Sequence, residues 1–317
     1  MKVAAAQVRG PWLDKVGATK VVIDVLHRAA ALGVQLVAFP ETFLSGYPFW
    51  VCRTGGASFE DARQKSAYAY YLDAAVEVDG PEVRTITEAA ADLGVFTYLG
   101  TTERGVTDGR GTVWCTLLAI DPRHGLVGAH RKLVPTHDER LVWGRGDGAG
   151  LRAHPVGEWR VSGLNCWENW MPQARAALYA DGTDLHVGVW PGTVVLTESV
   201  TRFIAMEGRL WSMAASGIPR LADVPADFPL FDELSEPAAD LPFDGGSGIV
   251  GPDGTWVAGP VVGREELVVA DIDCGLLGRE RLGVDPSGHY HRPDVFSLTV
   301  DRRRMGPVRF LDDDGAR

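Results

Sequence analysis

Residues 163–170, GLNCWENW, place one cysteine between a small apolar run and two tryptophans. Cys166 ends the strand-like segment WRVSGLN and precedes a helix start at Met171–Pro172, since proline is well tolerated in the first turn of a helix. A residue on such a turn lies at a sheet edge, where backbone N–H groups can point at a developing negative charge. A lone cysteine is more often a buried apolar residue. A nucleophile here therefore needs a base and a cation nearby.

Strand-like segments, each bounded by Gly, Pro or Asp, recur on both sides of this turn. They cover residues 3–8, 35–40, 96–103, 116–121, 125–132, 159–166, 185–190, 212–218, 247–251 and 267–273. Helical patterns cover residues 18–32, 62–78, 81–93, 171–180 and 198–211, with Gly33 and Pro81 as helix end and start signals. This alternation predicts an α/β layered fold. We expect one domain over residues 1–300 and a C-terminal tail over 301–317, because the sequence has no repeat and no break in composition.

Two segments have irregular composition. Residues 223–246 are rich in Pro and Asp and are too polar for the core, so we expect a functional loop or an assembly element there. The tail after Val300 mixes basic and acidic blocks, and is either a solvated end or an intersubunit contact.

Three charged residues follow strand-like segments and are candidate partners for the cysteine. Glu41 follows QLVAFP at 35–40, and Lys132 ends GLVGAHRK at 125–132. Glu139 comes seven residues after Lys132, before the apolar LVW. Each position alone also fits an ion pair or an exposed charge. Together with Cys166 they form a stronger pattern, because α/β folds gather active-site groups at the ends of neighbouring strands.

The composition excludes several classes of function. The net charge is −11, and an acidic protein repels phosphate, so we expect no nucleic-acid partner and no membrane partner. The longest apolar runs are strand-sized, well short of the roughly 20 residues of a membrane helix. The N-terminal MKVAAAQV is expected to be a strand and not a signal peptide. The four cysteines lie far apart, which favours a reducing, cytoplasmic location.

The chain resembles the nitrilase superfamily, and within it the nitrilase branch, over about residues 2–300. The segments that carry this resemblance are FPETFLSGYPFW (39–50), HRKLVPTHDERLVWGRGDG (130–148), GLNCWENWMPQARAALYADG (163–182), WPGT (190–193), TRFIAMEGR (201–209), GGSGIVGPDG (245–254) and GHYHRPDVF (288–296). Trp170 departs from the pattern, since this branch more often has tyrosine there. That departure bears on the shape of the pocket and not on the chemistry.

The resemblance implies a four-layer α-β-β-α sandwich and a catalytic triad of Glu41, Lys132 and Cys166. Glu41 is expected to be the general base, Lys132 to favour the thiolate and stabilise developing charge, and Glu139 to support them. The backbone N–H of Trp167 is a candidate second donor. We expect strongly coupled titration in this cluster. No metal and no organic cofactor is expected.

The expected reaction is hydrolysis of an organic nitrile to a carboxylic acid and ammonia, through a thioimidate and a thioester. The aromatics nearest the catalytic residues in sequence are Tyr47, Trp167, Trp170 and Trp190. If they line the pocket, the small-molecule substrate is an apolar, aromatic or arylaliphatic nitrile. Any of them can instead pack in the core.

Alternatives remain open at this point. An amidase or carbamoylase of the same superfamily would use the same triad, and a cyanide-hydrolysing enzyme would share these segments. A papain-like hydrolase lacks a histidine placed beside Cys166. His289 and His291 alternate as on one strand face, but no third metal ligand stands nearby. The glycines at 144–150 lack the Lys–Ser/Thr of a phosphate loop. A binding scaffold that kept the fold need not have kept all three triad residues.

The resemblance also implies a homodimer or a larger homo-oligomer. We expect two subunits to pair through the helices at Met171 to Ala180 and Val200 to Trp211. The tail at 301–317 is a further candidate for an intersubunit element.

Overall fold

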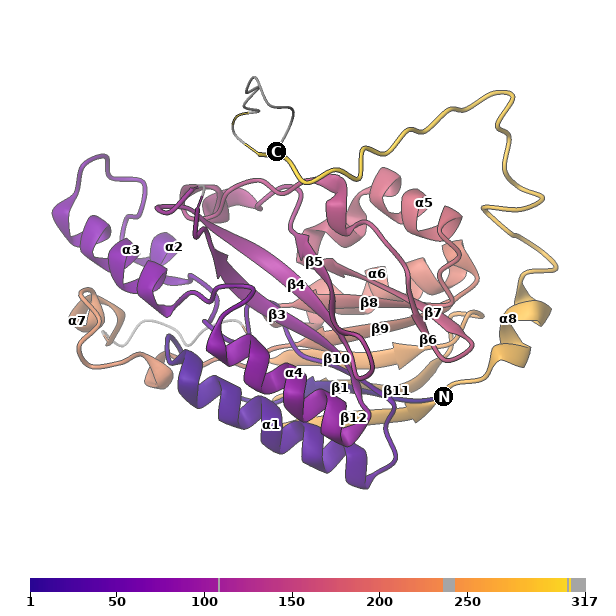
Figure 1. The fold of residues 1–317 in the computed structure, drawn as a ribbon, viewed down its shortest axis with the longest axis horizontal. Helices are drawn as coiled ribbons and strands as arrows, with labels where there is room; N and C mark the ends of the chain where they lie inside the picture. Colours follow the sequence, from indigo (N-terminus) through magenta and orange to yellow (C-terminus); the bar gives the residue numbers. More distant parts are fainter. Residues whose placement is uncertain (108, 236–242, 307, 309–317) are drawn as a thin grey trace, which may run out of the picture.

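Two six-stranded mixed sheets form the centre of the molecule (Figure 1). The computed structural model describes residues 1–317 except 108, 236–242, 307 and 309–317. The first sheet has the order β12 (Glu266–Asp271), β1 (Lys2–Gln7), β2 (Leu36–Ala38), β3 (Phe96–Arg104), β4 (Val113–Asp121), β5 (Gly125–Arg131). The second has the order β11 (Trp256–Val262), β10 (Gly245–Val250), β9 (Trp211–Ser216), β8 (Leu185–Trp190), β7 (Trp159–Asn165), β6 (His154–Val156). In each sheet three central strands are parallel and the flanking strands pair antiparallel.

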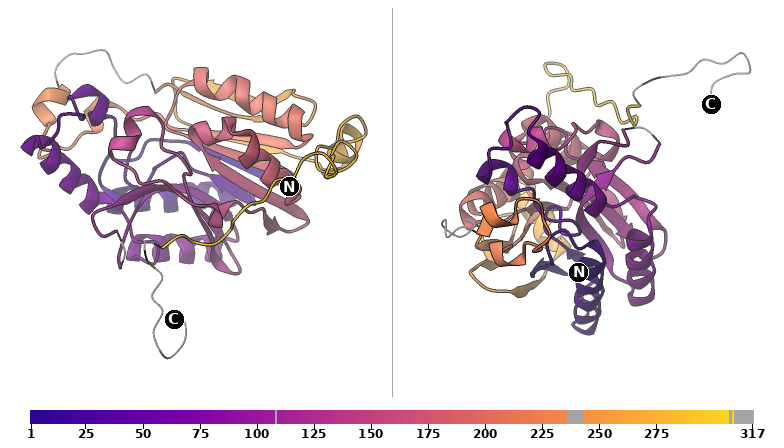
Figure 2. Two further views of the ribbon diagram at one scale, coloured as in Figure 1. Left: turned by 90° about the horizontal axis from the view of Figure 1, so that it is seen from above. Right: turned by 90° about the vertical axis from the view of Figure 1, so that its left-hand side faces the viewer.

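Helices cover the outer face of each sheet, which gives the four-layer α-β-β-α arrangement (Figure 2). The helices α1 (Lys15–Ala31) and α4 (Pro81–Leu93) pack beside each other on the first sheet, and α5 (Pro172–Ala180) and α6 (Val194–Gly208) lie on the second. The remaining helices are α2 (Trp50–Arg53), α3 (Ala62–Ala74), α7 (Phe231–Ser235), α8 (Cys274–Glu280), and the 3₁₀ turns η1 (His137–Leu141), η2 (Gly148–Gly150), η3 (Cys166–Trp170), η4 (Leu221–Asp223). The predicted fold class is confirmed. Among the described residues, no helix is both long and apolar enough to span a bilayer.

Alternate residues of each strand of the first sheet enter different cores. On β1, Val3 and Ala5 face the second sheet, whereas Ala4 and Ala6 pack against the helices. Such strands are buried on both faces and therefore lack an alternating polar pattern. The parallel strands of each sheet run in the same direction as their neighbours, so the residues that follow β2 in the first sheet and β7 and β8 in the second lie toward one edge of the sandwich.

The sequence predicted most strands and the longer helices, but not the short helices α2, α7 and α8. The helix predicted at 62–78 ends at Ala74, because Val76 pairs instead with Glu103. The helix predicted at 198–211 covers Val194–Gly208 and ends where Arg209 takes a positive φ of 46°. The edge strands β6 and β11 were not predicted. Each contains a proline, which is tolerated at a sheet edge but resembles a turn signal in sequence.

The expectation that residues 223–246 are too polar for the core is wrong for the part that the structure describes. Val224, Phe228, Leu230 and Leu234 are buried in a cluster with the aromatic side chains of Trp12, Phe49, Trp50 and Tyr71. The polar residues between them reach solvent. Residues 236–242 of this segment lie outside the described residues.

Residues 282–299 form an arm that follows α8 and extends away from the body of the molecule (Figure 1). The expectation that His289 and His291 share a strand face is wrong, because this arm contains no strand. The chain returns at Val300, which packs against α5 residues, and Arg304 pairs with Asp147. Arg302, Arg304 and Met305 of the predicted tail thus contact the body of the chain, and residues 307 and 309–317 lie outside the described residues.

Candidate active site

Glu41 follows β2 by three residues and lies at the edge of the sandwich. Its backbone N–H donates to Trp190 O at 3.3 Å, which ties it to the end of β8 in the opposite sheet. Gly100 on β3 makes room for this segment, because a Cβ there would lie 2.0 Å from Pro40 O and 2.7 Å from Glu41 Cα. The Glu41 side chain is buried. A glycine in the middle of a buried strand is thus explained by the close approach of another backbone.

Lys132 directly follows β5 and its long side chain is buried. Its backbone N–H donates to Cys115 O on β4 at 2.8 Å, so the strand pairing continues through it. A capping box at the start of η1 holds Glu139 close to Lys132. Its side chain accepts from Thr136 N at 2.6 Å, while the Thr136 side chain caps the Glu139 backbone. This reciprocal arrangement fixes a glutamate in a short turn.

Cys166 directly follows β7 and opens η3. Its φ is 47°, in the left-handed region that non-glycine residues rarely adopt. A strained backbone of this kind persists only where surrounding contacts impose it. Here the buried Glu168 carboxylate accepts from Asn165 N at 3.0 Å, from Leu133 N and from His130 Nε2 at 3.1 Å. These bonds join the cysteine turn to the segment that carries Lys132.

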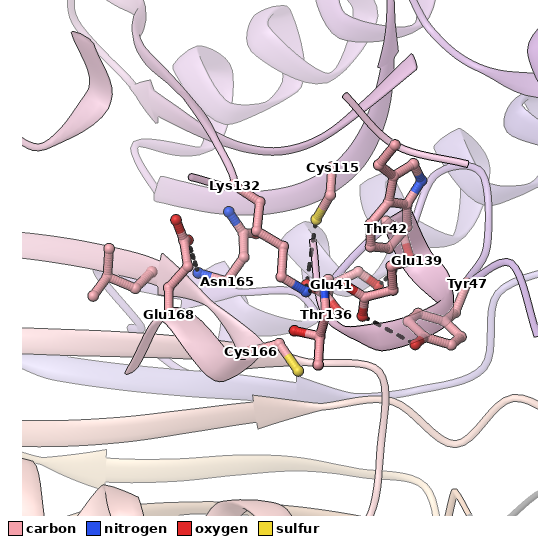
Figure 3. Close-up of polar contacts among 12 residues, drawn as sticks. Glu41, Thr42, Tyr47, Cys115, Lys132, Thr136, Glu139, Asn165, Cys166 and Glu168 are labelled. Carbon is pink, nitrogen blue, oxygen red and sulfur yellow. Dashed lines mark hydrogen bonds and ion pairs between the residues drawn. The ribbon is translucent and has the colours of Figure 1, made fainter. Parts of the chain in front are cut away.

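The segments that follow β2, β5 and β7 bring four side chains into one buried cluster: Glu41, Lys132, Glu139 and Cys166 (Figure 3). Lys132 Nζ donates to Glu41 Oε1 at 2.9 Å and to Glu139 Oε2 at 2.8 Å. Cys166 Sγ and one oxygen from each carboxylate all lie within 4.8 Å of one another. Tyr47 completes the cluster, since its hydroxyl donates to Glu139 Oε1 at 3.0 Å. Two acids, one ammonium and one thiol therefore share a site that is closed to solvent.

Comparison with known proteins agrees with this geometry. The profile of the family described as "Carbon-nitrogen hydrolase" matches residues 2–281. The chain belongs to the carbon-nitrogen hydrolase family. It is 37% identical over 279 residues to "Nitrilase blr3397" of Bradyrhizobium diazoefficiens, covering 88% of this chain and 85% of that one. It is 36% identical over 310 residues to "Nitrilase 2" of an unknown prokaryotic organism, covering 98% and 95%.

A solved structure supports the fold. The carbon-nitrogen hydrolase from Helicobacter pylori G27 superposes with a TM-score of 0.70, covering 93% of this chain and 97% of that one, at 16% sequence identity. The predicted membership of the nitrilase superfamily is confirmed, and the Glu41–Lys132–Cys166 arrangement expected from it is present.

Burial and charge set the protonation states in this carbon-nitrogen hydrolase. Burial, reinforced by the charge of Glu139, raises the pKa of Glu41 to about 7 although Lys132 opposes the shift. Burial and the two carboxylates also raise the pKa of the Cys166 thiol well above its usual value, opposed by Lys132 and by the Trp167 N–H. Burial alone would lower the pKa of Lys132, but the surrounding negative groups outweigh it and raise it. The resting site thus holds a thiol and an ammonium, and the thiol needs a base to remove its proton.

The predicted aromatic residues are split between two places. Trp190 is buried, and the ring of Tyr47 contacts Trp143 and Phe243 edge to face beside Glu139. Trp167 and Trp170 are 44% and 41% exposed, with ring centroids 6.3 Å apart. Trp170 also stacks on Phe203 of α6 at 6.4 Å. The structure therefore brings Tyr47 to the cluster and leaves Trp170 at the outer surface.

The cluster has ligand types that could hold a metal, but its charges favour another arrangement. Glu41, Glu139 and Cys166 form the one group of such side chains with suitable spacing in the described residues. The ammonium of Lys132 contacts both carboxylates. A cation is thus already supplied by the chain at the point where the two acids meet.

Several residues that shape the site were not predicted from the sequence. Beneath the cysteine turn, Asn169 Nδ2 donates to Cys166 O at 2.8 Å, and its Oδ1 is 2.7 Å from His186 Nε2. Burial lowers the pKa of His186 to about 3, so its ring is neutral. Glu168 had an available signal, because Asn165 followed three residues later by glutamate is typical of a helix start. Cys115 had none, because it stands before the segment predicted as a strand.

Proposed function

We propose that this carbon-nitrogen hydrolase is a nitrilase, which converts an organic nitrile and two water molecules to a carboxylic acid and ammonia. The observation that carries the proposal is the buried cluster of Cys166, Glu41 and Lys132 in a chain that matches proteins named nitrilases over most of its length. The cluster supports attack on carbon bonded to nitrogen, and the relatives support the nitrile as the substrate.

Each residue has a defined role in the first half of the proposed reaction. Glu41 takes the proton of Cys166, and the sulfur forms a bond to the nitrile carbon. One π bond of the nitrile breaks, and its electron pair moves to nitrogen. Lys132 stabilises this charge, together with the N–H of Trp167, and the nitrogen takes the proton from Glu41. The product of this half is a neutral thioimidate on Cys166.

The second half removes nitrogen and then sulfur. Glu41, again a carboxylate, takes a proton from a water molecule as its oxygen adds to the thioimidate carbon. Glu41 returns this proton to the nitrogen. The added hydroxyl then loses its own proton, which also passes to the nitrogen, the carbon–nitrogen bond breaks, ammonia leaves, and a thioester remains. A second water adds in the same way, the carbon–sulfur bond breaks, and Cys166 recovers its proton as the acid leaves. A pKa of about 7 suits Glu41 for this work, because it must accept and return protons near neutral pH.

The geometry distinguishes the two glutamates. Both oxygens of Glu139 accept hydrogen bonds, from Tyr47 on one side and from Lys132 and Thr136 on the other. Glu41 has one oxygen engaged, whereas Oε2 has no partner in the part of the chain that the structure describes. We therefore assign the base to Glu41 and a supporting role for Lys132 to Glu139.

An apolar, aromatic or arylaliphatic nitrile is the proposed substrate class. The support comes from three aromatic residues: Tyr47, whose hydroxyl contacts Glu139, Trp190 at the end of β8, and Trp167, which directly follows the nucleophile in sequence. Trp170 is 41% exposed, so we assign it a contact with the pocket only through its tilted ring contact with Trp167.

The testing experiment measures ammonia release from benzonitrile, phenylacetonitrile, an aliphatic nitrile, cyanide and the matching amides, beside Cys166→Ala. We expect ammonia from an aromatic nitrile and none from the variant. Release from amides alone would contradict the nitrile assignment and indicate an amidase. Release from cyanide alone would indicate a cyanide-hydrolysing enzyme. Activity that survives in Cys166→Ala would contradict the mechanism.

We further propose that the enzyme is a homodimer or larger homo-oligomer in the cytoplasm. Trp170, Phe203 and Met206 form an exposed apolar stripe at the predicted pairing helices, with 41%, 40% and 39% of their surfaces accessible. The arm at 282–299 lies outside the body beside the same layer and exposes Phe296 and Tyr290. A second subunit would bury these surfaces. The four cysteines are unpaired, which fits a reducing compartment.

A further inference from the structure

Cys115 is a second buried cysteine at the candidate active site, on β4, which lies next to the edge strand β5 of the first sheet. It lies near the start of β4 and is 1% exposed. Its thiol donates to Glu41 Oε1 at 3.3 Å, and its backbone carbonyl accepts from Lys132 N at 2.8 Å (Figure 3). Cys115 therefore contacts the catalytic glutamate through its side chain and the catalytic lysine through its backbone, without belonging to the triad.

The two oxygens of Glu41 are not equivalent because of these contacts. Oε1 accepts from Lys132 Nζ at 2.9 Å and from the Cys115 thiol. Oε2 is buried and receives no hydrogen bond from the residues that the structure describes. A buried carboxylate oxygen without a donor keeps its lone pairs available and is a strong proton acceptor.

The terminal torsion of a glutamate is soft, so one contact does not determine it. The last side-chain torsion has a broad, roughly two-fold energy profile, and the two oxygens can exchange places. The ammonium of Lys132 can follow either oxygen, because its three hydrogens rotate freely. A second donor fixed on a strand removes that freedom. The Cys115 thiol is such a donor, since Cys115 lies in the paired part of β4 opposite Thr102.

We propose that Cys115 is a positioning residue: its thiol holds Oε1 of Glu41 and leaves Oε2 as the oxygen that takes the proton of Cys166. This inference rests on Glu41 acting as the base in the proposed function. Cys115 does not contact the substrate in this proposal and acts only through Glu41. The catalytic step is the one already given, so the proton passes from Sγ of Cys166 to Oε2 of Glu41.

The same contact affects the acidity of Glu41. The titratable groups that act on Glu41 or are acted on by it are Lys132, Glu139, Cys115, Cys166, Tyr47 and Tyr71. Burial raises the pKa of Glu41, and the hydrogen bonds from Lys132 and Cys115 lower it. Loss of the thiol should therefore raise the pKa of Glu41 further. The acidic limb of the pH–rate profile would then move to higher pH.

The test compares Cys115→Ala, Cys115→Ser and the remote control Cys274→Ala on α8. The pH profile of kcat/KM is measured with the nitrile that gives the fastest ammonia release. We expect Cys115→Ala to lose about tenfold in kcat/KM below pH 7, with its acidic limb at higher pH. Cys115→Ser keeps a donor and should recover most of the rate. Its acidic limb should lie at the same pH as in the parent enzyme or at a lower pH. Cys274→Ala should match the parent enzyme.

Two results would overturn the proposal. One is an unchanged limb and rate in Cys115→Ala. The other is a loss of rate in both Cys115 variants with no shift of the limb, which a packing defect alone would produce. If Cys115→Ala does not fold, Cys115→Val takes its place, since it also removes the donor to Glu41 and must show the same shift of the acidic limb.

A second measurement separates this proposal from the nitrile assignment. The rate at which iodoacetamide alkylates Cys166 is followed by mass spectrometry of its peptide across pH 5.5–8.5, with no nitrile present. Its pH dependence reports the base that activates Cys166, whatever the substrate is. We expect the Cys115→Ala profile to move to higher pH here as well. An enzyme that hydrolyses no nitrile but shows this shift would contradict the proposed function and keep the role of Cys115.

Discussion

Lys132 Nζ lies 2.9 Å from Glu41 Oε1, and both groups are closed to solvent in a site that also holds a second carboxylate. One ammonium thus faces two acids. Because burial and Glu139 outweigh the ammonium, the pKa of Glu41 rises to about 7. A carboxyl group with an ordinary pKa would be a weak base toward a thiol, whereas this one is matched to proton transfer near neutral pH.

The first prediction concerns the pH dependence of the reaction. Glu41 must be ionised to accept a proton, and the pKa of about 7 means that it becomes protonated as pH falls below 7. We expect kcat/KM to fall toward tenfold per pH unit well below that value. Ammonia release between pH 5 and 8.5 measures it. A rate that stays flat down to pH 5.5 would show that Glu41 is not the group being titrated.

The second prediction separates the roles of the two glutamates. Glu41→Gln removes the free basic oxygen, and kcat should fall by about 10²–10⁴-fold. Glu139→Gln keeps an oxygen that can accept from Tyr47 or Lys132, so it should lose less activity and retain an acidic limb. Both rates are measured at pH 8 after circular dichroism has verified folding. The assignment of Glu41 as the base would be contradicted if both variants lost kcat equally and Glu139→Gln had no acidic limb in its pH–rate profile.

The third prediction concerns the buried ion pairs. Lys132→Met leaves Glu41 and Glu139 close together without a cation, and we expect a loss of about 3–5 kcal/mol in the free energy of unfolding. The folded variant should bind a proton at one carboxyl to relieve the repulsion, which raises its pKa above the unfolded value. The stability deficit should therefore shrink as pH falls from 8 to 6. Urea denaturation at both pH values measures it, and a deficit independent of pH would rule out the explanation.

The fourth prediction concerns the glycine beneath Glu41. Gly100→Ala would place a Cβ 2.0 Å from Pro40 O, so the segment that carries Glu41 must move. We expect a loss of about 1–3 kcal/mol in stability and a larger loss of activity than stability alone explains. Gly278→Ala on α8 is the matched control, because nothing lies within 4 Å of its added carbon. Comparable activity in the two variants would argue against the close approach.

The fifth prediction concerns the exposed apolar stripe. Phe203→Glu should place a charge where a second subunit packs and should shift the enzyme to monomers in light scattering after size-exclusion chromatography. Val106→Glu places the same charge at an exposed apolar residue outside the stripe and should leave assembly unchanged. A parent enzyme that is already monomeric and fully active at nanomolar concentration would contradict the oligomer proposal.

Sequence patterns predicted the features that depend on local order. The strand before Cys166 and the helix that begins at Pro172 follow from an apolar run and a proline, and both were correct. The positions of Glu41 and Lys132 after strands were also correct, because parallel strands end at a common edge. The resemblance supplied the order of the layers and the identity of the triad.

The remaining features depend on contacts between distant segments. Nothing local shows that Val224 and Phe228 would be buried, since their neighbours are Pro and Asp. The hydrogen bond from Cys115 to Glu41 joins residues 74 positions apart and follows from sheet pairing. Glu168 is buried although it is charged, because His130 and two backbone N–H groups hold it. Each of these requires the tertiary fold before it can be recognised.

The groups that we propose as catalytic come from both sheets, since Glu41 and Lys132 follow strands of the first sheet and Cys166 follows a strand of the second. Gly163, three residues before the nucleophile, sets the spacing there, because an added Cβ would lie 2.6 Å from Leu117 Cδ2 of the facing sheet. Turnover thus depends on the packing distance between the two sheets. On gradual heating, inactivation should come before the loss of far-ultraviolet ellipticity, because the sheets can separate slightly while every strand keeps its partners.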